Sequence, residues 1–225
     1  MWLADTGGVF LGAAIDTIVQ PPVWCPDGSQ LAWTFDGINT LNVHSGSRKK
    51  LIGGTDTVYE VYDWSKDGNR LLSRLAVLDD RKVIQRGELW EIALSGQLVR
   101  RIFARDSLVV TYAQWSPDED EIALIYLKTG DYYTTRATGI MLLGDPGPTV
   151  TALAPELRTW ADRATYGIGR GLRWSPDGQE LGYKVKTNRG DGLTWSKTFI
   201  VDKSGMILRV FFDDSTATHE ITDWR

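Results

Sequence analysis

The sequence contains a single cysteine, and this excludes two kinds of site. One thiol, Cys25, cannot form an intramolecular disulfide or supply a cysteine-rich zinc site. The two histidines, His44 and His219, are far apart in sequence, and no further ligand pattern accompanies either. The acidic run 118–121 lacks the alternating oxygen ligands and the glycine bend of a calcium loop. We therefore expect neither a metal ion nor a cofactor.

Long apolar runs and blocks of like charge are missing as well. No run is long enough to span a membrane, and the apolar stretch 9–19, which Asp16 interrupts, does not have the form of a signal peptide. The net charge of −4 comes without a basic stripe, so nucleic-acid binding is not expected. No Gly-x-Ser-x-Gly elbow and no glycine-rich phosphate loop is present. Without a complete catalytic constellation, the sequence favours a protein that is not an enzyme.

What the sequence does contain is a repeated phrase, Trp-Ser-Pro-Asp-Gly. Self-similarity at a period of several tens of residues is typical of stacked repeat architectures. Cys25, Lys66 and Glu119 stand where the phrase has Ser, Pro and Gly. Since Gly accepts the left-handed conformation, Glu119 predicts either a different turn or a non-glycine residue with positive φ. The four copies are Trp24–Gly28, Trp64–Gly68, Trp115–Glu119 and Trp174–Gly178.

Each phrase is expected to close a β-hairpin. Pro fixes φ for the second position of a type I turn, Asp suits the third, and Gly follows in the left-handed conformation. An apolar β segment follows each turn, and then come another apolar strand, a small-residue turn and a fourth run. Four strands in two hairpins make one propeller blade. The sequence thus predicts an all-β β-propeller of four-stranded antiparallel blades, with four complete blades and partial blades at residues 1–14 and 219–225.

The tryptophan that opens each phrase is predicted to be structural and to pack between neighbouring blades. Burying an indole of about 200 Å² at about 25 cal/mol per Å² is worth roughly 5 kcal/mol as an upper bound. The tryptophans concerned are Trp24, Trp64, Trp115 and Trp174, with Trp224 on the approach to a fifth copy.

The phrase and its spacing resemble the blades of TolB-type propellers, a branch of the WD-like β-propeller repeats that also forms the propeller domains of prolyl-oligopeptidase-type peptidases. Because the resemblance covers nearly the whole chain, we expect one soluble propeller domain over residues 1–225. The two partial blades either share one closing blade or mark a fragment of a larger propeller, and we favour the fragment. The resemblance permits a periplasmic or other extracytoplasmic location, and the sequence leaves the oligomeric state open.

One face of the predicted propeller is expected to carry its longest loops. The turns within hairpins fall on one face of such a ring, and the other links, at 74–86, 128–138, 154–171 and 184–197, fall on the opposite face. Binding residues concentrate on loops held by a rigid scaffold, and aromatic and arginine side chains anchor interfaces. This loop-rich face is therefore the predicted surface for a protein or peptide partner. Its candidate residues are Tyr132, Tyr133, Trp160, Arg170 and Trp195.

An alternative applies to Trp160, and three functions stay open for the whole chain. A short helix after Pro155 would pack Trp160 back on the propeller as a core residue. The chain is a non-catalytic scaffold for protein or peptide binding, the substrate-gating propeller of a prolyl-oligopeptidase-type peptidase whose catalytic domain lies elsewhere, or a carbohydrate-active propeller. The missing active site favours the scaffold, although fold alone does not define function.

Overall fold

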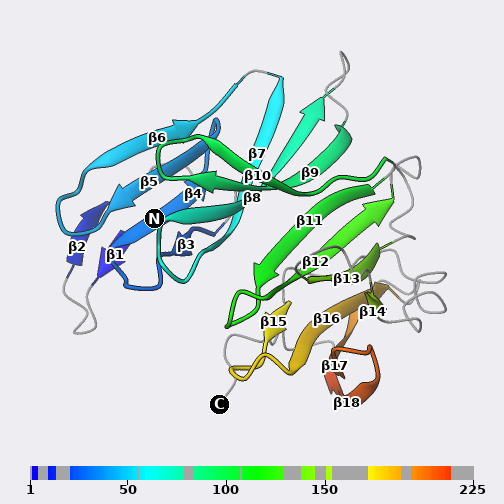
Figure 1. Ribbon diagram of the computed structural model, residues 1–225. Coiled ribbons are helices and arrows are strands. Elements are labelled where there is room, and N and C mark those ends of the chain that lie inside the picture. Colours follow the sequence, from blue (N-terminus) through cyan, green and yellow to red (C-terminus); the bar gives the residue numbers. More distant parts are fainter. Residues whose placement is uncertain are drawn as a thin grey trace. The chain divides into compact units, whose positions relative to one another are not determined.

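The computed structural model describes residues 2–4, 10–13, 21–54, 56–78, 84–106, 108–128, 138–144, 151–153, 172–188 and 194–213. The regular elements in these residues are β-strands, numbered β1 to β18 along the chain (Figure 1). The chain divides into two compact units, residues 1–104 and 105–225, and each is described by itself.

The first unit holds one hairpin and two four-stranded antiparallel blades. In the hairpin, β1 (Trp2–Ala4) pairs with β2 (Phe10–Ala13). The first blade has the spatial order β3 (Val23–Trp24), β4 (Gln30–Thr34), β5 (Ile38–Asn42) and β6 (Arg48–Ile52). The second blade pairs, in sequence order, β7 (Thr57–Trp64), β8 (Arg70–Leu78), β9 (Ile84–Ala93) and β10 (Leu98–Phe103).

The second unit holds two more blades of the same kind. The third blade pairs β11 (Leu108–Trp115), β12 (Glu121–Lys128), β13 (Thr138–Gly144) and β14 (Thr151–Leu153). The fourth pairs β15 (Arg173–Trp174), β16 (Glu180–Asn188), β17 (Thr194–Asp202) and β18 (Ile207–Asp213). The all-β fold with four complete blades is thus confirmed. The partial blade expected at 219–225 lies outside the described residues.

The phrase turns have the backbone that their chemistry predicts. Gly28, Gly68 and Gly178 have φ of 73°, 70° and 67°. Glu119, at the same place in the third blade, has φ of 65°, and its N–H donates to the Ser116 carbonyl as in the other turns. Of the two possibilities for Glu119, the structure shows the non-glycine residue with positive φ in an unchanged turn.

In the three turns that contain serine, the serine hydroxyl forms a hydrogen bond to the aspartate of the phrase. The Ser65 hydroxyl donates to Asp67 at 2.5 Å and accepts from the Arg70 N–H at 2.9 Å. Ser116 and Ser175 repeat this arrangement in the third and fourth blades. In the first blade, where Cys25 replaces the serine, Asp27 accepts from Ser29 instead. The phrase is therefore a self-contained hydrogen-bonded turn at one end of each blade.

Neighbouring blades within a unit pack through the phrase tryptophans. In the first unit, the buried Trp64 lies in a core with residues of both blades, and its indole N–H donates to the Val23 carbonyl at 2.9 Å. In the second unit, Trp174 lies in a core that again draws on both blades, and its indole N–H donates to the Gln114 carbonyl at 3.3 Å. In both cases the acceptor is the residue before the tryptophan of the preceding phrase. The structural role predicted for these two tryptophans is confirmed.

Trp24 differs from the other phrase tryptophans. It is 50% exposed, whereas Trp64, Trp115 and Trp174 are at most 7% exposed. Its blade is the first complete one among the described residues, and no described blade covers the indole. The expectation that Trp24 packs between blades is therefore wrong for the described structure.

Two of the expected long loops are largely strand. Strand β8 continues to Leu78 and β9 begins at Ile84, so the link drawn at 74–86 shrinks to residues 79–83. Likewise β16 continues to Asn188 and β17 begins at Thr194, which shortens the link drawn at 184–197. The apolar run Leu75–Leu78 continues β8, and Lys184 and Lys186 alternate with Val185 along β16, as in extended strands. The links inside 128–138 and 154–171 lie outside the described residues.

Candidate functional site

The residues predicted for the binding face are not brought together by the described structure. Tyr132, Tyr133, Trp160 and Arg170 lie outside the described residues, as does the helix expected after Pro155. Trp195 lies in β17, where its backbone pairs with Thr187, and its side chain is not described. These five residues therefore stay a prediction.

The described structure instead presents a cluster on the second blade, built around Glu88 of β9. Glu88 is buried, and its carboxylate accepts from the Trp90 indole N–H at 2.8 Å. Arg86 places its Nε 2.9 Å from the same carboxylate. The Arg101 guanidinium, from the neighbouring strand β10, lies 6.0 Å from the Trp90 ring centroid and 3.6 Å from Glu88. A buried carboxylate thus accepts one hydrogen bond from an indole and lies within ion-pair distance of two arginines that are about half exposed.

A second buried carboxylate lies on the opposite face of the same blade. Glu60 of β7 pairs with Arg74 of β8 at 2.7 Å, and both side chains are almost fully buried. The Tyr62 hydroxyl donates to Glu60 at 3.1 Å. Glu60 is directly opposite Arg74, and Glu88 is directly opposite Leu75. Because Arg74 and Leu75 are consecutive in β8, their side chains point to opposite faces of the blade. We assign the Glu60 group to stability, because its members are too buried to meet a partner.

The Glu88 group extends to the exposed end of the blade, where the loops between hairpins begin. Val77, near the end of β8, pairs directly with Arg86, and the two side chains are about equally exposed, at 45% and 47%. Direct partners in an antiparallel pair share a face, so Val77, Arg86, Glu88 and Trp90 belong to one surface.

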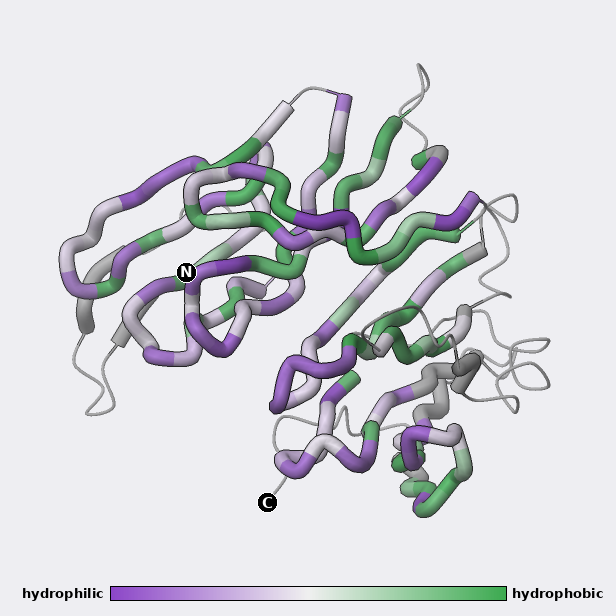
Figure 2. Tube along the Cα trace, in the orientation of Figure 1, coloured by the Kyte–Doolittle hydropathy of each residue, from purple (hydrophilic) through white to green (hydrophobic). Residues whose placement is uncertain are grey.

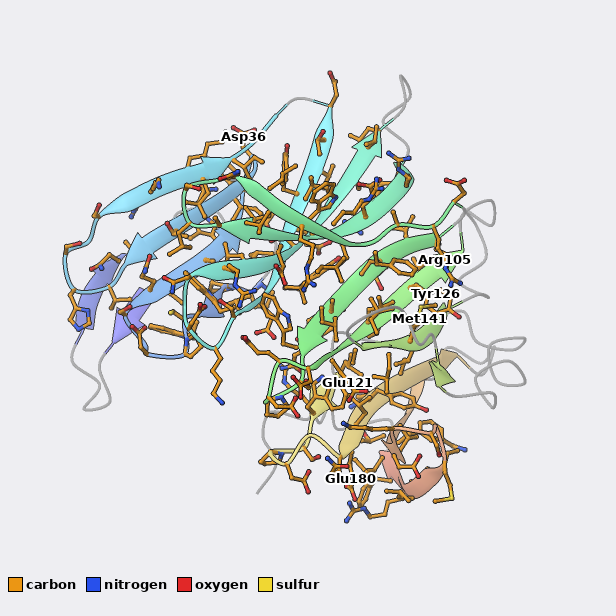
Figure 3. The ribbon with its side chains drawn as sticks, in the orientation of Figure 1. Asp36, Arg105, Glu121, Tyr126, Met141 and Glu180 are labelled. Carbon is orange, nitrogen blue, oxygen red and sulfur yellow. The ribbon has the colours of Figure 1, made fainter. Side chains whose placement is uncertain are left out.

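In the first blade, Phe35 lies at the corresponding position, in the turn between β4 and β5 that links the two hairpins. Phe35 follows Thr34, whose hydroxyl accepts from the Val61 N–H of β7 at 3.0 Å, so the turn after β4 lies beside β7. Phe35 is 46% exposed. Its neighbour Asp36, labelled in Figure 3, pairs with Lys50 at 2.7 Å. We call the set Phe35, Val77, Arg86, Glu88 and Trp90 the loop-end surface of the first unit.

The loop-end surface combines exposed apolar groups with one cation, Arg86, and the Arg101 guanidinium lies 3.6 Å from its Glu88 carboxylate. Phe35 and Val77 offer apolar contact area, and Arg86 offers a guanidinium whose position a buried carboxylate sets. Arginine and aromatic side chains in fixed positions are the usual anchors of protein interfaces. The cluster contains no nucleophile beside a base, which acyl transfer and related chemistry would need. The arrangement is suited to binding an apolar side chain together with an acidic group.

The opposite, turn end of the blades is acidic and internally bonded. The serine hydroxyl bonds lower the pKa of Asp67, Asp118 and Asp177, and the Ser29 N–H lowers the pKa of Asp27. In the second unit, Lys203 lies 2.5 Å from Glu121 and 5.8 Å from the Trp174 ring centroid, which joins the fourth blade to the third. These contacts give the turn end a structural role.

Sequence reasoning missed the loop-end surface, although one signal for it was present. Arg86, Glu88 and Trp90 stand at alternate positions, which in a strand puts all three on one face. The residues were instead assigned to a loop and to the strand after it, so the alternation was not used. The position of Phe35 relative to these residues depends on how two blades pack, for which the sequence has no signal.

Within the part of the chain that the structure describes, no group of three or more His, Cys, Asp or Glu side chains is arranged to hold a metal ion. In the same residues, none of the elements is a helix with the length and apolarity to cross a membrane.

The four-stranded antiparallel blades, the phrase turns and the tryptophan contacts define the chain as a β-propeller. No protein-family model and no curated protein sequence matches it. Solved structures do match. A protein of Agrobacterium tumefaciens described as TolB superposes with a TM-score of 0.58 at 17% identity, over 84% of this chain and 64% of that one.

Two other solved propellers are similar to the same extent. The Swd1 β-propeller domain of Myceliophteria thermophila superposes with a TM-score of 0.57 at 16% identity, over 86% of this chain and 55% of that one. The acylaminoacyl peptidase of Pyrococcus horikoshii superposes with a TM-score of 0.52 at 16% identity, over 84% of this chain and 31% of that one. The fold is a β-propeller like those of these solved structures, as the repeated phrase predicted. This chain spans less than two thirds of the length of each of these proteins.

Proposed function

We propose that the chain is a non-catalytic propeller scaffold that binds a protein or peptide partner through the loop ends of its blades. The observation that supports this most is the loop-end surface of the first unit, where exposed Phe35 and Val77 accompany Arg86. Exposed apolar groups beside polar anchors are typical of interaction sites.

The chemistry of this surface restricts the partner. Phe35 and Val77 favour an apolar side chain, and Arg86 and Arg101 favour a carboxylate. Both arginines already face Glu88, and both are about half exposed, so a second carboxylate can share their remaining donors. We therefore propose a partner segment that carries an acidic residue next to an apolar or aromatic one.

The residues first predicted for the binding face belong to the same proposal. Tyr132, Tyr133, Trp160, Arg170 and Trp195 are predicted to lie on or beside the links between hairpins or between blades, within residues 105–225. They supply the aromatic and cationic groups that interfaces favour. A triple replacement of Tyr132, Tyr133 and Arg170 by alanine tests them as a group, because it should weaken partner binding and leave the melting temperature unchanged.

The direct test is a displayed peptide library selected on the purified chain. We expect selected peptides to share an acidic residue beside an aromatic or aliphatic one. The variant Phe35→Ala combined with Arg86→Ala should lower their affinity at least about tenfold, because hot-spot truncations cost more than about 1 kcal/mol each. Val99→Ala is the matched control, since Val99 is 51% exposed on β10 outside the loop-end surface.

Two results would contradict this assignment. One is a set of selected peptides whose affinity is the same for the parent chain and for the Phe35 and Arg86 double variant. The other is equal weakening by the Val99→Ala control, which would indicate a general effect on the fold. Circular dichroism spectra of all variants are needed to separate these cases.

A second candidate is the substrate-gating propeller of a prolyl-oligopeptidase-type peptidase. The likeness to acylaminoacyl peptidase, of which this chain covers 31%, supports it at the level of fold. Such an enzyme would carry a Gly-x-Ser-x-Gly elbow on a catalytic domain in the same reading frame. Finding that elbow would favour the peptidase, and a reading frame that encodes only propeller repeats would contradict it.

A further inference from the structure

We propose that β18, the outermost strand of the fourth blade, pairs antiparallel with β18 of a second copy of this chain, which makes a symmetric dimer. Among the described strands, β17 is the one that pairs with β18, at its inner edge. The outer edge therefore offers a row of backbone N–H and C=O groups, which is a template for another strand. This proposal is independent of the loop-end surface.

The side chains of this edge are apolar and exposed. Leu208, Val210 and Phe211 of β18 are 40%, 37% and 53% exposed, and Met206 just before the strand is 59% exposed. Six of the seven residues at 206–212 are apolar. A segment of this length with high β propensity and low charge is one that tends to pair with another strand.

The outermost strands of the first and second blades are built differently. Strand β6 exposes Arg48, Lys49 and Lys50 in succession, and β10 exposes Arg100 and Arg101. Cations on an edge strand prevent pairing with another copy through repulsion. Figure 2 shows these cationic stretches of β6 and β10 as hydrophilic.

Strand β18 has no such protection. Its one cation is Arg209, which forms an ion pair with Glu180, labelled in Figure 3, and remains 54% exposed, so it can also face an acidic group. Two outermost strands, β6 and β10, thus carry exposed cations, whereas β18 is mostly apolar. This difference indicates that another strand covers the outer edge of β18.

The register of β18 selects a second copy as the occupant. The pairing with β17 is irregular between Ile200 and Val201, and it is regular from Arg209 to Asp213. This five-residue stretch is centred on Phe211. A two-fold axis at Phe211 would set Arg209 opposite Asp213 of the second copy, twice, and Val210 opposite Phe212 of the second copy, twice. Opposite charges at facing positions of an antiparallel pair stabilise it, so the strand is complementary to itself.

The size of the apolar patch predicts a weak dimer. Met206, Leu208, Val210 and Phe211 expose on the order of 350 Å² per copy, against roughly 600 Å² per partner at the lower limit for stable interfaces. Backbone pairing and flanking side chains have to supply the remainder. We therefore expect a dissociation constant of about 1 to 100 μM.

Sedimentation velocity of the whole chain between about 1 and 200 μM tests the proposal. The parent chain should shift from monomer to dimer over this range. Phe211→Lys should raise the dissociation constant by about 100-fold or more, because it sets two lysines against each other on the axis. Val99→Lys is the matched control: Val99 is 51% exposed on the outer strand β10, and its replacement should leave the dimer unchanged.

A charge-exchange experiment tests the register itself. Arg209→Asp alone and Asp213→Arg alone should each be monomeric, since each sets like charges opposite one another twice. An equal mixture of the two variants should form a heterodimer, because every facing pair in it is again of opposite charge. Circular dichroism of each variant shows that the blade has folded.

Three outcomes would overturn the proposal. A parent chain that stays monomeric up to about 200 μM would overturn it. A dimer that Phe211→Lys leaves unchanged would place the contact elsewhere. Two single variants that fold yet do not associate when mixed would exclude the register centred on Phe211.

Discussion

At the scale of single residues, the turn of the repeated phrase requires a backbone conformation that suits glycine, and the third blade has a different residue there. The fifth position needs positive φ, and Glu119 has φ of 65° there in place of glycine. A non-glycine residue in the left-handed region costs roughly 1 to 2 kcal/mol. The turn keeps its hydrogen bonds all the same, because Ser116 and Asp118 hold it from inside.

We predict that Glu119→Gly stabilises the protein by about 1 kcal/mol, since glycine relieves the positive φ and loses some chain entropy on folding. The increase should appear in the urea midpoint. Glu119→Ala serves as the control and should not produce it, because alanine keeps the unfavourable φ. Equal gains from both variants would assign the effect to removal of the carboxylate.

The phrase aspartates also determine how the protein responds to acid. The Ser175 hydroxyl, followed by the Gln179 N–H, holds the pKa of Asp177 below its usual value, and Ser65 and Ser116 do the same for Asp67 and Asp118. The native state therefore binds these protons more weakly than the unfolded chain does. The stability this provides is complete above the unfolded pKa of about 4 and is lost as the pH falls through the lowered value.

We predict that the denaturation midpoint falls below about pH 4 and that Ser175→Ala makes this fall less steep, since it removes the main cause of the lowered Asp177 pKa. Urea titrations at several pH values between about 3 and 7 measure it. A pH profile identical to that of the parent chain would show that the serine bond does not carry the effect.

At the scale of elements, the second blade is fitted to the first through its turns. Gly96, in the turn between β9 and β10, has φ of 92°, and a Cβ there would lie 2.1 Å from the Leu51 carbonyl oxygen. Gly46, in the corresponding turn of the first blade, has φ of 69° and nothing within 4 Å. A glycine with positive φ thus occurs in both turns, but only the turn of the second blade packs against a neighbouring backbone.

Replacing these two glycines separates backbone strain from packing. We predict that Gly46→Ala costs about 1 to 2 kcal/mol through φ alone, and that Gly96→Ala costs at least about 3 kcal/mol because backbone must also move. Urea denaturation of both variants measures the difference. If the two costs were equal, the close approach to Leu51 would have no energetic consequence.

Two of the phrase tryptophans, Trp64 and Trp24, differ in burial, so their replacement should differ in cost. We predict that Trp64→Ala loses about 3 to 5 kcal/mol, because it leaves a cavity between two blades and removes the bond to Val23. Trp24→Ala should cost less than about 1.5 kcal/mol, since half of that side chain is already exposed. Denaturant midpoints of the two variants, compared on one chain, provide the measurement. Similar losses would mean that Trp24 is covered in solution.

At the scale of the whole molecule, the single propeller domain over residues 1–225 stays a prediction. Contacts group the chain into units at 1–104 and 105–225, each with its own core. We expect one cooperative thermal transition, which both Trp64→Ala in the first unit and Trp174→Ala in the second should move to lower temperature. If each variant lowered only one of two separate transitions, the units would be independent domains.

The repeated phrase made the fold predictable from sequence. The chemistry of Pro, Asp and Gly acts within five residues, so the four turns and the strands beside them followed from local rules, whereas the choice between the two possibilities at Glu119 came from the structure. The strand limits were less predictable. Arg86 and Glu88 stand at alternate positions of β9, although Arg86 lies within the link predicted at 74–86.

The candidate binding surface was not predictable to the same degree. Arg86, Glu88 and Trp90 share a face through strand periodicity, which the sequence does show. Their association with Phe35 depends on the packing of β7 against β4, which no local pattern records.

By itself, then, the sequence determined the turn type, the number of complete blades and the strand order, because neighbouring residues along the chain decide those features. Only the tertiary structure decided which phrase tryptophan is exposed, which glycine is packed and which apolar strand is outermost among the described strands of its blade. The reason is physical: the burial of a strand face or edge depends on the element that lies against it, and that element is distant in sequence.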